Sequence, residues 1–81
     1  MLTVYTATHC PGHARTRKLV ARLNQHHPQI SVQVVNLDDP DTERPASVIG
    51  TPTYMWNGQI IFLGNPSESD LLFQLSKIEA L

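Results

Sequence analysis

The chain has 81 residues, of which 41% are hydrophobic and 16% are charged, with a formal net charge of −1. This length and composition are typical of one globular domain, residues 1–81, and exclude a disordered chain. No apolar run approaches the roughly 18 residues of a membrane span, and the charge does not favour nucleic acid or an anionic membrane as a partner. Met1 leads straight into strand-forming residues, without a signal peptide, so we expect a cytoplasmic protein.

The first half of the chain alternates between strand and helix patterns. Residues 2–6 alternate in side-chain type and are rich in β-branched and aromatic residues, which predicts a strand. From residue 11 to about residue 26, Leu19, Val20 and Leu23 recur at helical spacing, which predicts a helix with one buried side. The chain then alternates over 30–37 and becomes continuously apolar, which predicts an interior strand.

An acidic stretch separates the two halves. Residues 38–43 hold four acidic side chains around Pro40, a pattern typical of a loop followed by the start of a helix. Asp41 is placed to cap that helix. We expect it to span about 42–49 and to end at Gly50.

The second half predicts a hairpin and a last helix. Asn57-Gly58 joins two apolar, strand-like runs, which is the strongest short-range signal for a hairpin. Ser67-Glu68-Ser69-Asp70 has the pattern of a capping box ahead of an amphipathic helix. The expected order is β-α-β-α-β-β-α. Right-handed crossovers and a terminal hairpin predict an α/β fold with a mixed four-stranded sheet and helices on both faces.

The single cysteine, Cys10, lies between the first strand and the first helix, and it excludes an intrachain disulfide. The unpaired N–H groups and the positive dipole end of a helix N-terminus stabilise a thiolate. Pro11 suits a first helical turn, and His13, about one turn on, is placed to hydrogen-bond the sulfur or to pair with it when protonated. The pattern predicts an activated thiol; the alternative is a small buried apolar side chain.

Three motifs in this order resemble the thioredoxin-like superfamily, in the compact form of the glutaredoxins, over essentially the whole chain. They are Cys10-Pro11-Gly12-His13 after the first strand, Gly50-Thr51-Pro52-Thr53 before the third, and Gly64-Asn65-Pro66-Ser67-Glu68 before the last helix. In that family the first motif holds a nucleophilic cysteine and the second a cis-proline loop. The resemblance therefore implies that Thr51 and Pro52 hold the substrate beside Cys10.

Two departures from that family bear on the chemistry. His13 stands where dithiol members carry a second cysteine, so a mixed disulfide on Cys10 must be released by an outside thiol, such as glutathione or a protein cysteine. Ala7 stands where glutaredoxins place a basic residue that binds a glutathione carboxylate. Arg15, Arg17 or Lys18 could substitute for it, and the resemblance assigns the glutathionyl amine to Ser69 and Asp70.

These observations predict a thiol–disulfide oxidoreductase-like protein that acts through one cysteine. Its partners would be protein or small-molecule thiols and disulfides, its state a monomer or weak dimer, and glutathione a co-substrate rather than a bound cofactor. A catalytically degenerate thioredoxin-like binding or regulatory module is one alternative. A metal or iron–sulfur carrier that uses Cys10 and His13 is another, but no second pair of ligands is evident, so we assign no metal ligand.

Overall fold

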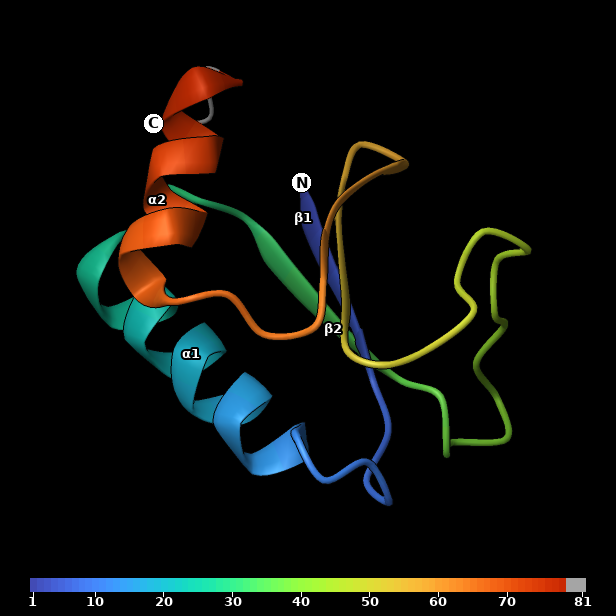
Figure 1. Cartoon of the computed structure of the whole chain (residues 1–81). Coiled ribbons are helices and arrows are strands. Elements are labelled where there is room, and N and C mark those ends of the chain that lie inside the picture. Colours follow the sequence, from blue (N-terminus) through green and yellow to red (C-terminus); the bar gives the residue numbers. More distant parts are fainter. Residues whose placement is uncertain (79–81) are drawn as a thin grey trace.

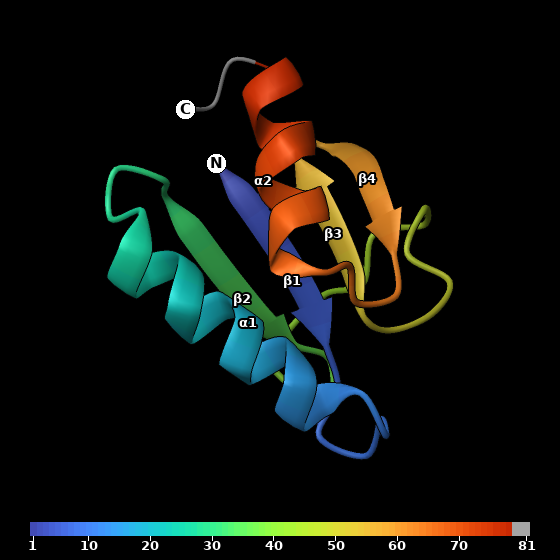
Figure 2. The ribbon, with the colours of Figure 1, turned by 60° about the vertical axis from the view of Figure 1, so that its left-hand side comes forward.

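The computed structural model describes residues 1–78. Its elements, in chain order, are β1 (Leu2–Thr6), α1 (His13–His26), β2 (Val32–Asn36), β3 (Thr53–Trp56), β4 (Gln59–Leu63) and α2 (Glu68–Lys77). The four strands form one sheet in the order β2-β1-β3-β4, which Figure 2 shows face-on. β1 and β2 are parallel, whereas β3 is antiparallel to both β1 and β4. The prediction of an α/β fold with a mixed four-stranded sheet is confirmed.

Both helices cover the same face of this sheet (Figures 1 and 2). The core lies between the sheet and the two helices. β1 contributes alternate side chains to it, since Leu2 and Val4 are fully buried and their neighbours are not. The helices contribute the apolar positions that recur at helical spacing. The core cluster consists of Leu2, Val4, Leu19, Val20, Leu23, Ile30, Tyr54, Leu71 and Leu75. Within residues 1–78, no helix is long and apolar enough to cross a membrane.

The prediction of a short helix over 42–49 is wrong. Residues 37–52 run as a loop, with one turn closed by a hydrogen bond from the Val48 N–H to the Pro45 carbonyl at 2.9 Å. Arg44 precedes Pro45, and a residue before proline is driven out of the α region. The Thr42 hydroxyl also competes for backbone carbonyls, lying 2.8 Å from that of Asp39. Asp41 caps no helix.

The loss of that helix corrects two further expectations. Helices do not cover both faces, because among residues 1–78 only the loop lies on the face opposite α1 and α2 (Figure 1), where Val48 is buried. β2 is an edge strand rather than an interior one, because the chain crosses to the far side of β1 after β2 and leaves its outer edge unpaired within the described residues. Val34 at this edge is 45% exposed.

The element ends follow the sequence signals. Asn57 and Gly58 adopt φ values of 49° and 85°, the left-handed conformations of a tight hairpin turn. Ser67 caps α2, because its hydroxyl accepts the Asp70 N–H at 3.1 Å. α1 ends at His26 as predicted, but it begins at His13 rather than Pro11, with Gly12 as its N-cap.

The burial pattern predicts which apolar side chains hold the fold. Leu23→Ala deletes a fully buried side chain and is expected to lower the free energy of unfolding by about 2–5 kcal/mol. Ile49→Ala is the matched control, because Ile49 is 83% exposed and its loss is expected to cost less than about 0.5 kcal/mol. Urea unfolding of both variants checks this, and equal losses would contradict the assigned core.

Candidate functional site around Cys10

Cys10 lies in a tight turn between β1 and α1. Its N–H donates to the Ala7 carbonyl at 2.9 Å, and its own carbonyl accepts the His13 N–H at 3.0 Å. These two bonds close the chain on itself just before the helix begins. The cysteine is free and partly exposed. Backbone hydrogen bonds on both sides therefore hold this partly exposed residue in place.

The Thr51–Pro52 segment, which leads into β3, lies beside this turn. The Cys10 thiol donates to the Thr51 carbonyl with a sulfur–oxygen distance of 3.4 Å. The Thr51–Pro52 peptide bond is cis, and Pro52 is buried. The Pro52 carbonyl accepts the Gly64 N–H at 2.8 Å, which joins this loop to the segment before α2. The structure therefore brings together three of the residues singled out in the sequence, Cys10, Thr51 and Pro52.

Gly12 lies close to both of these segments. A Cβ atom at Gly12 would lie 3.1 Å from the Asn65 side-chain nitrogen, 3.7 Å from Pro52 Cδ and 4.0 Å from the Cys10 sulfur. Any side chain here would force the Asn65 amide to shift. Pro11, beside it, is exposed and belongs to the turn rather than to the first turn of α1.

Asn65 is the site residue that sequence analysis missed. Its side-chain nitrogen donates to the Gly12 carbonyl at 3.0 Å, and its side-chain oxygen accepts from the Tyr54 hydroxyl at 2.8 Å. The Thr16 hydroxyl also lies 2.8 Å from that oxygen. One amide thus ties the cysteine turn and α1 to β3 and to the start of α2. Asn65 stood inside a motif already singled out, but its partners lie far away in sequence.

Tyr54 contributes a buried hydroxyl to this cluster. Its side chain is fully buried, and burial raises the pKa of the Tyr54 hydroxyl to about 12. The hydrogen bond with Thr16 and the positive charge of Arg15 act in the opposite direction on that pKa. Tyr54 is therefore a neutral hydrogen-bond donor at neutral pH.

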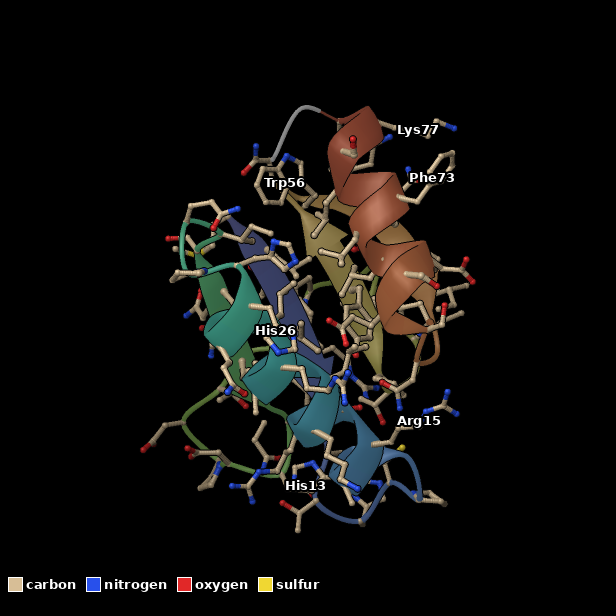
Figure 3. All side chains as sticks on the ribbon, turned by 90° about the vertical axis from the view of Figure 1, so that its left-hand side faces the viewer. His13, Arg15, His26, Trp56, Phe73 and Lys77 are labelled. Atoms are coloured by element: carbon tan, nitrogen blue, oxygen red, sulfur yellow. The ribbon has the colours of Figure 1, made fainter. Side chains whose placement is uncertain are left out.

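The His13 ring is hydrogen-bonded to β1. Its Nδ1 lies 2.9 Å from the hydroxyl of buried Thr6, and no hydrogen bond within residues 1–78 joins its ring to Cys10. The ring instead lines an open groove of about 460 Å³ between α1 and β2. Figure 3 shows His13 and Arg15 on opposite sides of α1. The role predicted for His13 as partner of the thiolate stays a prediction.

His9 fastens the cysteine turn to the loop that follows β2. The Asp38 carboxylate accepts the His9 N–H at 3.0 Å and lies 2.7 Å from His9 Nδ1. The backbone bond, supported by the ring, lowers the pKa of the Asp38 carboxyl below its ordinary value. His9 is 77% exposed, as expected of a loop residue, so this contact positions the turn at the surface.

Ser69 and Asp70, the residues assigned by resemblance to a glutathionyl amine, are exposed in the first turn of α2. The Ser69 hydroxyl lies 3.2 Å from that of Ser67, and the Asp70 N–H is taken by the same cap. No hydrogen bond within the described residues links either one to Cys10. The structure places them on the helix that begins beside the site, without bringing them to the sulfur.

Glu68, between them and the cap, joins the two helices. Its carboxylate accepts from Arg22 Nε at 2.6 Å and lies 3.2 Å from His26 Nδ1. The hydrogen bond from Arg22, followed by that from His26, lowers the pKa of Glu68 below its ordinary value of 4.5. This exposed contact joins the start of α2 to the C-terminal half of α1.

The described part of the chain gives no support to a metal centre, because residues 1–78 hold no group of three His, Cys, Asp or Glu side chains placed to bind one ion. The comparisons with known proteins add no assignment. Neither the protein-family models, nor the curated proteins, nor the solved structures contain a match to this chain.

The Asn65 cluster predicts coupled effects on stability. Asn65→Ala leaves the buried Tyr54 hydroxyl without its partner, which is expected to cost about 1–3 kcal/mol. Tyr54→Phe removes that hydroxyl, so it is expected to cost less in the Asn65→Ala background than in the wild type. A double-mutant cycle by urea unfolding measures the coupling, and simple additivity would show that the two side chains act independently.

The Glu68 contact predicts a pH-dependent contribution to stability. Because folding lowers the pKa of Glu68, the contribution is present above its ordinary value of 4.5 and is lost as the pH falls through the lowered value. Glu68→Gln is therefore expected to be less stable than the wild type at neutral pH and equally stable in acid. Urea midpoints across this pH range test it against Glu43→Gln, which removes the same charge from the loop before β3. A pH-independent difference for Glu68→Gln would contradict the assignment.

Proposed function

We propose that the chain is a compact thioredoxin-like domain. The sheet order β2-β1-β3-β4, with a parallel first pair and an antiparallel last pair, agrees with the resemblance carried by the three motifs. The closeness of the Cys10 turn to the Thr51–Pro52 loop supports the same proposal. The loop that replaces the expected helix over 42–49 is the departure from that layout.

We further propose that Cys10 performs thiol–disulfide exchange by a monothiol route. The observation that carries this proposal is the partly exposed Cys10 thiol, held 3.4 Å from the Thr51 carbonyl at the end of β1. The positive end of α1, which begins three residues later, favours the thiolate. No second cysteine stands in the chain to resolve an intermediate.

The exchange proceeds in two displacements. The Cys10 thiolate attacks one sulfur of a substrate disulfide, so that a mixed disulfide forms and the other substrate sulfur leaves as a thiolate. An outside thiolate then attacks the substrate sulfur of that mixed disulfide and releases Cys10 as a thiolate. The outside thiol ends in a disulfide with the substrate, so electrons balance without a cofactor. Glutathione or a protein cysteine supplies this thiol in our proposal.

Thr51 has a distinct part in these steps. In the reduced protein its carbonyl accepts the Cys10 S–H. When the thiol ionises, it no longer donates, and the Thr51 carbonyl becomes free to accept an N–H from an extended substrate segment. The Thr51 carbonyl oxygen thus exchanges the Cys10 S–H for a substrate N–H, beside the reacting sulfur.

A thioredoxin-like binding module is a second candidate, favoured by the same contact. A hydrogen bond from the thiol stabilises the neutral form over the thiolate. A cysteine held in this way would serve packing and recognition rather than attack. Such a module predicts an intact fold with an unreactive Cys10.

The rate of Cys10 alkylation against pH separates the two candidates. Exchange predicts a midpoint below about pH 7 in the wild type and formation of a mixed disulfide with oxidised glutathione. Cys10→Ser controls for other sites of reaction. A midpoint of the alkylation rate at about pH 8.5, without a mixed disulfide, would favour the binding module. His13→Ala belongs in the same series: its midpoint rises if the ring acts on the sulfur and is unchanged if the Thr6 bond holds the ring away.

A further inference from the structure

The positive charge of this protein is concentrated on α1. Four of its six Lys and Arg residues, Arg15, Arg17, Lys18 and Arg22, lie on this helix, which carries no acidic residue. Arg15, Lys18 and Arg22 stand at i, i+3 and i+7, so they share one side of the helix. Arg17 lies on another side, in the groove that faces β2. The helix therefore presents one basic stripe toward α2 and a single separate cation toward the sheet edge.

The basic stripe forms one wall of a second groove. This groove has a volume of about 330 Å³ and lies between α1 and the segment that begins α2. Its lining residues are Arg15, Lys18, Leu19, Arg22, Pro66, Ser67 and Glu68. The apolar floor and the three cations make it a place where an acidic chain segment can lie with its carboxylates on the α1 side.

The groove is only partly neutralised by the protein itself. Its one carboxylate, Glu68, is engaged by Arg22 and His26 at the end remote from the cysteine turn. Arg15 and Lys18 make no ion pair within residues 1–78. These two charges are therefore the ones available to a bound carboxylate, and both are exposed.

The Arg15 end of the groove is linked to the cysteine turn through Pro66 and its neighbour Asn65. Pro66 in its wall follows Asn65, whose amide donates to the Gly12 carbonyl at 3.0 Å. A Cβ atom at Gly12 would lie 4.0 Å from the Cys10 sulfur. The charge of Arg15 also reaches the Tyr54 hydroxyl, which bonds to the same Asn65. A segment that extends from the groove past Arg15 and Pro66 would therefore run toward the cysteine turn.

The opposite side of the cysteine turn carries the opposite charge. Asp38 bonds to His9 there, and it opens the loop stretch of four acidic residues at 38–43. A substrate with carboxylates beside its disulfide would be repelled on the Asp38 side and attracted on the Arg15 side. The charge distribution around Cys10 therefore favours one orientation of an acidic substrate.

We propose that Arg15 and Lys18 bind the carboxylates of an acidic peptide segment next to the substrate cysteine, which lies in the groove between α1 and Pro66. This inference rests on the proposed function, since it names the class of disulfide that Cys10 attacks. In the exchange step, the sulfur of that peptide bonds to Cys10 Sγ and the other sulfur of its disulfide leaves as a thiolate. The groove orients the peptide and raises its rate of encounter with Cys10, and it supplies neither a proton nor an electron.

The first test measures binding without chemistry. A peptide with aspartates and glutamates around a serine, in place of the cysteine, is titrated into the full chain and followed by NMR. We expect shifts at Arg15, Lys18 and Ser67, and affinity at least about tenfold above that of the same peptide with asparagine and glutamine. The preference should fall at high salt, because exposed charges are screened. Equal binding of the two peptides would overturn the inference.

The second test measures exchange with matched variants. The cysteine forms of both peptides, as disulfides with an aromatic thiol that absorbs light on release, are mixed with the wild type, Arg15→Gln/Lys18→Gln and Arg17→Gln. We expect the acidic peptide to react faster with the wild type and with Arg17→Gln, and the preference to be lost in the double variant. A preference that survives in the double variant would also overturn the inference.

The two tests fail in different ways. If binding depends on Arg15 and Lys18 but no exchange occurs, the proposed function is contradicted. The groove is then the docking site of an acidic peptide. Exchange at equal rates with both peptides would support the proposed function and overturn the groove. Glutathione disulfide is included because it also bears carboxylates: if its rate alone falls in the double variant, the two cations serve glutathione and the peptide proposal is wrong.

Discussion

The side-chain amide of Asn65 is the constraint on which the site depends. It bridges the carbonyl of Gly12, at the start of α1, to the hydroxyls of Tyr54 and Thr16, whose side chains are buried. A buried polar cluster is favourable only when each member has a partner, so the position of each segment is tied to the others. The place of Cys10 against Thr51 follows from this, because the cysteine turn cannot move away without breaking the Gly12 bond.

The one-sided arrangement of helices sets the rest of the architecture. With α1 and α2 on the same face, the sheet buries Leu2, Val4 and Tyr54 between two layers, and the other face is left to a loop. That loop carries most of the acidic residues, whereas α1 carries most of the basic ones. Both meet the cysteine turn: the loop bonds to it through Asp38, and α1 begins directly after it. Cys10 therefore lies between two surfaces of opposite charge as a consequence of the fold.

Sequence analysis predicted the elements whose signals are local. The alternation of β1, the spacing of Leu19 and Leu23, the Asn57-Gly58 turn and the Ser67 cap each depend on neighbours in sequence, and each is confirmed. The helix over 42–49 failed because its pattern is outweighed by a proline and by a hydroxyl that bonds to backbone. The edge position of β2 depends on where the chain crosses after it, which no local pattern encodes.

The same distinction explains what was found and missed at the site. Cys10 can be singled out from the sequence because it is the only cysteine, and because the motif that indicates its role consists of four consecutive residues. Asn65 has no such signal, since its three partners come from two other elements and a turn. His13 stands about one helical turn from Cys10 in sequence, and its Nδ1 lies 2.9 Å from the buried Thr6 hydroxyl on β1, a contact that helical spacing does not predict. Helical spacing predicts which side chains lie near one another, and the partner of each polar atom is decided by packing across the chain.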